Sequence, residues 1–342
     1  MITRRQFALS PAALGASTRR IRTAMIGTGH GHAASKIRAL ESMPEYEFLG
    51  VARPDPHDPA VGDVFSKVRW MEVDQILRDP SIEMVAAEFA DAEANLEYAQ
   101  RAIDAGKFVH LDKPPGASLS GLRKLLGDAA RKKLVVQMGY QWRYHPAMEA
   151  VMEAARRGWL GRVYRFRASI DKPIGWEERR HLAKYRGGMM FSEGCHLIDR
   201  ATALLGKPVK VTGFIRHDAP IDDQLADNNL VILEYRSAIA EISLAGFDPH
   251  GNQHRYVEVL GTNGSAKAQP FSPVRLHVEL KESAGPYRAG LQTLEPPNPQ
   301  GLAYTPDFRE LAAVIRNGAK PSYSAEHDSM TQEVLLSACG ML

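Results

Sequence analysis

The stretch AGKFVHLDKPP at residues 105–115 is the part of the sequence that decides the fold. Its apolar run at residues 108–113 predicts a strand that ends on Lys113. Pro114 biases Lys113 toward an extended backbone and Pro115 stiffens the turn, so the ammonium group can be held in one place. In a parallel sheet, the carboxyl end of a strand borders the crevice where ligands bind.

Similar apolar runs alternate with amphipathic stretches on both sides of this strand, a pattern typical of βα units around a parallel sheet. We predict strands at residues 21–27, 47–53, 83–89, 108–113 and 134–140, and helices at residues 31–42, 73–77, 95–105 and 118–131. Asn95 and Ser118 are the predicted N-caps, because their side chains can accept from free N–H groups of a first turn. Residues 21–141 are therefore predicted to form a doubly wound Rossmann domain.

The pattern changes after a predicted helix at residues 146–157. Strands are predicted at residues 163–170, 209–216, 229–235, 238–244, 256–260 and 274–280, with one helical interruption at residues 192–205. The sequence GTNG at residues 261–264 predicts a tight hairpin. A polar, Pro-rich stretch at residues 285–306 precedes helices at residues 307–317 and 325–339. The predicted fold is thus α/β, with an α+β domain at residues 142–342 built on a large, open, mostly antiparallel sheet.

Bulk properties agree with two globular domains and exclude several classes of partner. The chain has 342 residues, 44% hydrophobic and 24% charged, and its net charge of +3 comes from scattered basic residues, which indicates no nucleic-acid partner. No apolar run of 18 residues is present, so we expect no membrane span. Cys195 and Cys339 stand far apart without metal-ligand spacing, so no metal site is predicted.

The first 20 residues are set apart as a leader. The sequence TRRQF at residues 3–7, followed by a mildly apolar stretch, resembles a twin-arginine export signal. This predicts a periplasmic protein. The alternative is a basic leader on a cytoplasmic protein.

A glycine-rich turn follows the first predicted strand. The sequence GTGHGH at residues 27–32 puts glycines where a dinucleotide pyrophosphate approaches the backbone, before a helix whose N-terminus favours anions. His32 stands at the third position of the fingerprint, where Gly or Ala is usual, and Gly31 or Ala33 can take over the packing. The predicted cofactor contacts are Gly27, Thr28, Gly29, His30, Gly31 and His32. The alternative is a glycine turn without a ligand.

Arg53 ends the second predicted strand, where an NAD site usually has an acidic residue. A guanidinium suits a 2′-phosphate through paired hydrogen bonds, which favours NADP over NAD. Asp55 lies two residues on and can still reach the ribose, so both cofactors stay open.

Residues 105–115 resemble the AGKHVxxEKP signature of the Gfo/Idh/MocA oxidoreductases, with Asp112 in place of the usual Glu. The resemblance extends over nearly the whole chain from Ile21. It implies that Lys113 is catalytic, that Ala90, Asp112 and Lys113 contact the cofactor, and that the protein is a homo-oligomer, a dimer or tetramer, formed through the open sheet.

Residues 187–199, GGMMFSEGCHLID, resemble the family segment GGGxxxDxGxHxxD. The resemblance implies that His196 acts as general base. Position 192, however, is Ser rather than Asp. Glu193 is adjacent, but one residue along an α-helix rotates it by about 100°, so it cannot take the place of the acid without a local change.

The predicted function is hydride transfer between NADP or NAD and a secondary alcohol or carbonyl of a sugar-like substrate. The predicted substrate contacts are Arg143, Tyr185, Ser192, Glu193 and Asp199. Two alternatives stay open. One is a redox-neutral enzyme that keeps its cofactor bound, for coupled sugar oxidoreduction or glycoside cleavage by transient oxidation. The other is a non-catalytic NAD(P)- or sugar-binding protein, suggested by the missing acid at Ser192.

Overall fold

The computed structural model describes residues 19–296 and 304–342. The predicted twin-arginine motif at residues 3–7 lies outside the described residues. Within the described ranges, no helix is long and apolar enough to cross a membrane.

The first sheet is parallel and has the strand order β2-β1-β3-β4-β5. Its strands are β1 (Ile21–Ile26), β2 (Tyr46–Ala52), β3 (Met84–Ala87), β4 (Phe108–Leu111) and β5 (Val136–Met138), and its helices are α1 (Ala33–Ser42), α2 (Val73–Arg78), α3 (Ala92–Asp104) and α4 (Leu119–Arg131), with a 3₁₀ turn η1 (Asp63–Ser66). Every residue of β3 is buried, as expected for a central strand covered on both faces. The predicted Rossmann sheet is confirmed.

One of the two predicted N-caps is wrong. α3 begins at Ala92, and the Asp91 carboxylate caps it by accepting from Glu93 N at 2.8 Å. The side chain of Asn95 instead accepts from Phe89 N at 2.8 Å and donates to Phe89 O at 2.9 Å. It therefore fixes the loop that follows β3. The predicted Ser118 cap is confirmed by its bond from Gly121 N at 3.0 Å.

The second sheet has eight strands in the order β13-β12-β11-β10-β6-β9-β8-β7. Their bounds are β6 (Val163–Ser169), β7 (Lys210–Arg216), β8 (Asn228–Glu234), β9 (Ile239–Ala245), β10 (Tyr256–Gly261), β11 (Gly264–Ala268), β12 (Leu276–Leu280) and β13 (Gly290–Leu294). All neighbours are antiparallel except β6 and β9. Gly261 pairs with Gly264 at the predicted hairpin. The prediction missed β11 and the largely exposed edge strand β13, which has no buried face to produce an alternating pattern.

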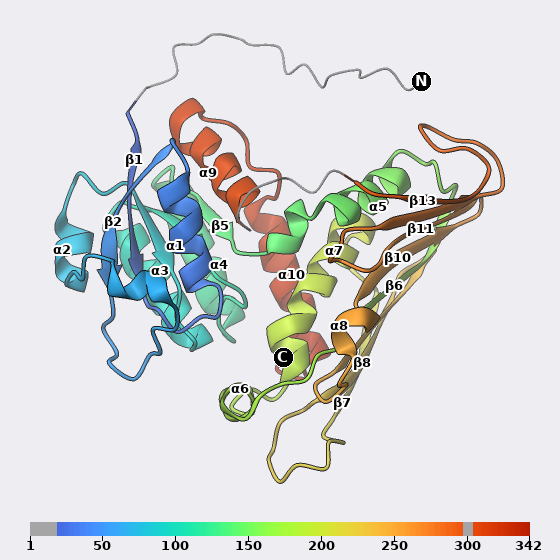
Figure 1. Cartoon of the computed structure of the whole chain (residues 1–342), viewed down its shortest axis with the longest axis horizontal. Helices are drawn as coiled ribbons and strands as arrows, with labels where there is room; N and C mark the ends of the chain where they lie inside the picture. Colours follow the sequence, from blue (N-terminus) through green and yellow to red (C-terminus); the bar gives the residue numbers. More distant parts are fainter. Residues whose placement is uncertain (1–18, 297–303) are drawn as a thin grey trace.

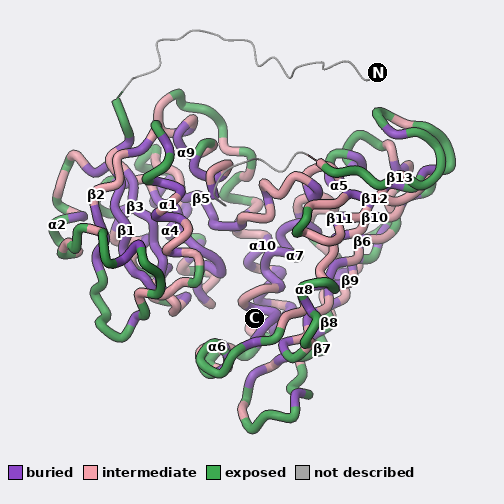
Figure 2. Tube along the Cα trace, in the orientation of Figure 1, coloured by how far each residue is buried: buried purple, intermediate pink, exposed green. Residues whose placement is uncertain are grey.

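Helices α5 (Pro146–Arg156), α7 (Cys195–Leu205) and α10 (Ala325–Ala338) lie between the two sheets (Figure 1). The buried residues gather in the first sheet and in these helices, as Figure 2 shows. The remaining short elements are η2 (Gln141–Tyr144), α6 (Trp176–Leu182), the π-helical turn η3 (Met190–Gly194) and α8 (Gly251–His254). The predicted helix at residues 192–205 therefore begins as a π-turn and continues as α7.

Helix α9 (Thr305–Asn317) follows the strands of the second sheet in the sequence but packs on the first sheet. Phe308 and Leu311 belong to the same hydrophobic cluster as Ile21 and Tyr46. Tyr46 Oη donates to Phe308 O at 2.7 Å. The segment that follows residue 141 is thus shared between the two sheets.

Candidate active site

Lys113 follows the end of β4 and is almost fully buried. Its Nζ donates to the Ser192 carbonyl oxygen at 3.0 Å and lies 3.8 Å from the Glu193 carboxylate. The two segments with the family resemblance, residues 105–115 and 187–199, therefore meet at this ammonium group.

The π-turn explains how Glu193 reaches Lys113. A π-turn adds a residue to a helical turn and so rotates the residues around it relative to a regular α-helix. Here Ser192 presents its carbonyl oxygen to Lys113, and the same oxygen accepts from Cys195 Sγ at 3.0 Å. Glu193 supplies the carboxylate instead. This turn is the local change that the sequence analysis required before Glu193 could replace an acid at position 192.

The Glu193 carboxylate lies between two lysines. In addition to Lys113, it accepts from Lys172 Nζ at 2.8 Å, and Lys172 also pairs with the half-exposed Glu178 at 2.6 Å. Burial alone would raise the pKa of Glu193, but the charges of Lys113 and Lys172 outweigh it and hold that pKa well below its usual value. Glu193 is therefore a carboxylate at neutral pH.

His196 stands one turn into the same helical segment and is buried. Its ring stacks on Trp142 at 5.1 Å between centroids and meets the edge of Tyr140 at 5.8 Å. Burial, with the nearby Lys113 charge, holds the pKa of His196 well below its ordinary value. The imidazole is therefore neutral, and its Nδ1 is buried without a hydrogen-bond partner in the described part of the chain.

A cluster of ionisable side chains surrounds the fully buried Asp112. Its carboxylate lies 2.6 Å from Lys36 Nζ, 2.9 Å from His30 Nδ1 and 3.1 Å from His32 Nδ1. Lys36 also donates to Glu88 at 2.7 Å. Burial alone would raise the pKa of Asp112, but His30 and Lys36 lower it well below its usual value. The glycine turn, α1 and the strand end before Lys113 are therefore joined by one network.

The glycine turn has the backbone conformation and the close contacts that only glycine allows. Gly27 has a φ of +88°, and a Cβ there would lie 2.6 Å from the Phe89 ring. A Cβ on Gly29 would collide with the Asp58 carboxylate, so any side chain at that position would fill the cradle. The N–H groups of Thr28 and Gly29 both donate to a carboxylate, at 2.7 and 2.8 Å, so they are aimed at an anion position. Gly31 has open space around it.

Two family models match these two halves of the chain. The model described as "Oxidoreductase family, NAD-binding Rossmann fold" matches residues 21–140, and the GFO/IDH/MocA C-terminal domain model matches residues 148–267. The chain belongs to the GFO/IDH/MocA oxidoreductase family. The resemblance stated from residues 105–115 and 187–199 is confirmed.

The relatives of this GFO/IDH/MocA protein have low sequence identity to it, but the matches cover most of each chain. YhhX of Escherichia coli K12, named an uncharacterized oxidoreductase, is 24% identical over 303 residues, 83% of this chain and 84% of its own. The dTDP-3,4-didehydro-2,6-dideoxy-α-D-glucose 3-reductase of Streptomyces violaceoruber is 26% identical over 70% of each chain. An Agrobacterium radiobacter oxidoreductase, solved with NAD+, L-tartaric acid and magnesium, shares the fold with a TM-score of 0.78 at 16% identity over 94% of this chain and 97% of that one.

The strand end that carries Arg53 is open to solvent in this GFO/IDH/MocA member. The Arg53 guanidinium lies 5.5 Å from the centroid of Trp70, and no carboxylate among the described residues pairs with it. Asp55 is exposed, and its carboxylate accepts from His57 N at 2.8 Å within its own loop. The arginine is therefore free to meet a ligand, whereas Asp55 points into a local turn.

Tyr185 and His181 contact the loop after β3, which carries Ala90. Tyr185 Oη accepts from Ala92 N at 2.9 Å, and His181 Nε2 lies 2.5 Å from the Ala90 carbonyl oxygen. Phe191 packs on the Tyr185 ring at 4.7 Å between centroids. These contacts tie the loop that carries the predicted cofactor contact Ala90 to the helical segment that carries Glu193.

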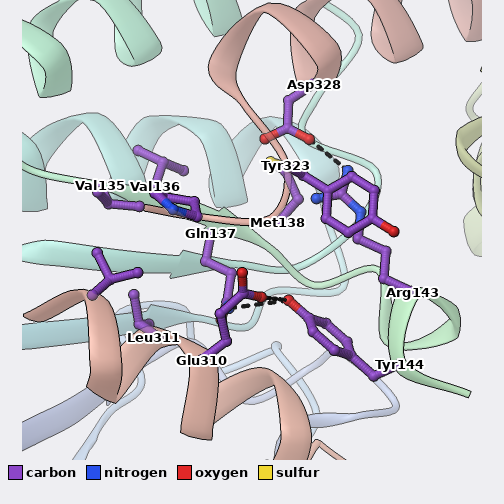
Figure 3. Close-up of a pocket in the computed structure, with 12 residues that line it drawn as sticks. Val135, Val136, Gln137, Met138, Arg143, Tyr144, Glu310, Leu311, Tyr323 and Asp328 are labelled. Carbon is purple, nitrogen blue, oxygen red and sulfur yellow. Dashed lines mark hydrogen bonds and ion pairs between the residues drawn. The ribbon is translucent and has the colours of Figure 1, made fainter. Parts of the chain in front are cut away.

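Arg143 and Asp199 lie in a separate, buried ion cluster. Arg143 donates to Asp199 at 2.7 Å and to Asp328 at 2.5 Å, and Asp199 also accepts from Arg200 at 2.6 Å. Figure 3 shows Arg143 and Asp328 beside a small cavity of about 20 Å³. Because these groups are satisfied within the protein, the geometry favours a structural role for Arg143 and Asp199 over the predicted substrate contact.

Four residues of the site were not predicted from the sequence: Lys36, Glu88, Lys172 and Asp58. A signal for two of them exists in retrospect, since Lys36 interrupts the apolar face of α1 and Glu88 follows the apolar run of β3. Nothing in the sequence pattern marks Lys172 or Asp58, because their contacts with Glu193 and with the glycine turn join residues 21 and 30 positions apart.

Proposed function

We propose that this oxidoreductase transfers hydride between a nicotinamide cofactor and a secondary alcohol or carbonyl carbon of a sugar- or polyol-like substrate. The observation that carries the proposal is the meeting of the Lys113 ammonium, the Glu193 carboxylate and the neutral His196 at the end of β4. The sugar reductase among the relatives supports the substrate class.

In the direction of oxidation, His196 takes the hydroxyl proton of the substrate, because a neutral imidazole has a free lone pair. Lys113 donates a hydrogen bond to the developing alkoxide and so stabilises its charge. Glu193 keeps the ammonium in place, and Lys172 balances the carboxylate. When bound, a nicotinamide cofactor would supply the hydride acceptor, and the substrate carbon would become a carbonyl after loss of one proton to His196 and one hydride. Reduction reverses each of these transfers.

The glycine turn and the loop at Ala90 are proposed to hold the cofactor, with Arg53 at its adenosine end. The backbone N–H groups of Thr28 and Gly29 would bind the pyrophosphate. Asp112 fixes His30 and His32 beside this turn. Tyr185, Ser192 and Glu193 are proposed to line the substrate position.

The test is a panel of sugars and polyols with added NAD or NADP, followed through the absorbance of the reduced nicotinamide. We expect turnover of at least one substrate. Because the pKa of His196 is lowered, the base stays neutral at acidic pH, so the oxidation rate should fall only below the pH range of an ordinary imidazole. Clear ligand-induced thermal shifts without turnover would instead favour the non-catalytic alternative. That alternative rested on the missing acid at Ser192, and the position of Glu193 now supports catalysis.

We propose that NADP is preferred over NAD because Arg53 is exposed and free of carboxylate partners. Replacing Arg53 with alanine is expected to weaken NADP binding by roughly tenfold and leave NAD binding nearly unchanged, since only NADP carries the 2′-phosphate. Calorimetric dissociation constants for both cofactors check this. The nearby Arg69 offers a control of equal charge on the adjoining segment. Tighter NAD binding by the wild-type protein would contradict the preference.

We further propose a homo-oligomer, a dimer or tetramer, formed through the outer face of the second sheet. Phe214 and Leu230 face each other on β7 and β8 and remain 53% and 38% exposed. A Cβ on the neighbouring Gly213 would meet α10, so Phe214 points away from the helices. Light scattering should therefore give a multiple of 37.8 kDa for the wild-type protein and a lower mass for Phe214→Glu. A wild-type species at 37.8 kDa would contradict the proposal.

A further inference from the structure

Asp58 lies in the loop after β2, and its carboxylate is held by the glycine turn. Its Oδ2 accepts from Thr28 N at 2.7 Å and from Gly29 N at 2.8 Å, and its Oδ1 accepts from Ala90 N at 3.3 Å. The residue is only 7% exposed. One internal carboxylate therefore satisfies N–H groups from both cofactor loops.

These N–H groups are the donors with which a glycine turn before a helix binds phosphate. The collision expected for a Cβ on Gly29 involves Asp58 itself, so the glycine gives the carboxylate room to enter. A pyrophosphate and the Asp58 carboxylate cannot use the same N–H groups at once, and their like charges repel each other.

We infer that Asp58 closes the pyrophosphate position in the cofactor-free protein and has to leave it when a dinucleotide binds. Asp58 is thus a residue that sets cofactor affinity. The loop around it has the surface position that such a movement needs, since Asp55 and His57 are exposed and Val61 is 77% exposed. This inference rests on the cofactor binding that the proposed function requires.

Removal of the Asp58 carboxylate should then change cofactor affinity and the stability of the free protein in opposite directions. If the closed arrangement must open first, the apparent dissociation constant equals the intrinsic constant divided by the open fraction. Removing the carboxylate therefore strengthens cofactor binding. It also leaves the N–H groups of Thr28 and Gly29 without their acceptor, which lowers the stability of the free protein. A residue that contacts the cofactor favourably would instead weaken binding when it is removed.

The experiment measures calorimetric dissociation constants of ADP-ribose, NAD and NADP for the wild-type protein, Asp58→Ala and Asp58→Asn. We expect Asp58→Ala to bind all three on the order of tenfold more tightly and to melt at a lower temperature without ligand. Asp58→Asn keeps an acceptor oxygen without the charge, so an intermediate gain is expected. This variant also allows the dissociation constants to be measured if Asp58→Ala folds poorly.

Asp74→Ala is the matched control, because it removes the same charge at an exposed position on α2, where the carboxylate pairs with Arg78 and not with the glycine turn. We expect its affinities to stay within about twofold of wild type, as for a screened surface charge. Equal or weaker binding by the Asp58 variants, or an equal gain in Asp74→Ala, would overturn the inference. The affinity measurement needs no turnover. If the protein binds cofactor but oxidises no sugar, the proposed function is wrong, and the affinities of the Asp58 variants still test the role of Asp58.

Discussion

Replacing Lys113 with methionine is expected to lower kcat/KM by about 1000-fold, because general acid–base and electrostatic groups contribute on this scale. Methionine keeps most of the length and apolar packing of the lysine stem and removes only the ammonium. The loss should fall mainly on kcat, since the charge is needed when the alkoxide develops. Steady-state rates and calorimetric cofactor binding measure the two contributions separately.

Lys107→Met is the matched control for this prediction. Lys107 is also buried, stands just before β4 at its opposite end and donates to Asp79 O at 2.5 Å. We expect this variant to lose stability while its kcat stays close to wild type. Equal activity of Lys113→Met and the wild-type enzyme would remove Lys113 from the mechanism.

Replacing Glu193 with glutamine is expected to lower kcat on the order of 100-fold, the scale of a lost electrostatic partner in a buried site. Glu193 acts as a positioning residue, because it lies 3.8 Å from Lys113 Nζ and anchors that group to Lys172. Its charge also raises the pKa of His196 against the larger effects of burial and Lys113. Without that charge the pKa of His196 falls further. The acidic limb of the pH–rate profile should therefore move to lower pH, which a merely structural role would not cause.

Two variants separate this role from general effects of charge. Glu178→Gln removes the other, more exposed partner of Lys172 and should leave the profile nearly unchanged. Ser192→Asp restores the family residue but should not raise activity, because position 192 turns its carbonyl oxygen toward Lys113. A gain in Ser192→Asp, or a normal pH profile in Glu193→Gln, would contradict the assignment.

Much of the fold follows from local sequence patterns. Apolar runs of strand length predicted all five strands of the first sheet, because buried parallel strands are apolar on both faces. The same criterion missed β13, whose residues stay largely exposed at the sheet edge. The α3 cap was wrongly predicted at Asn95, since Asp91 and Asn95 both have capping side chains and only the tertiary contact to Phe89 decides between them.

The residues of the candidate site could also be predicted only in part. Lys113 and His196 could be proposed from motifs, because their neighbours in sequence carry the signal. The contact of Glu193 with Lys113 could not be predicted, since a π-turn changes the helix register without a distinct periodicity. Lys36 and Glu88 are separated by 52 positions, so only folding brings their charges together.

The packing of α9 on the first sheet affects folding during synthesis and the expression of separate fragments of the protein. Phe308 and Leu311 complete a core whose other members include Ile21 and Tyr46, which leave the ribosome first. The nucleotide-binding half therefore cannot finish folding as an independent N-terminal unit during synthesis. A fragment cut at the visible junction near residue 141 would expose that apolar surface, and the two halves would have to be expressed together.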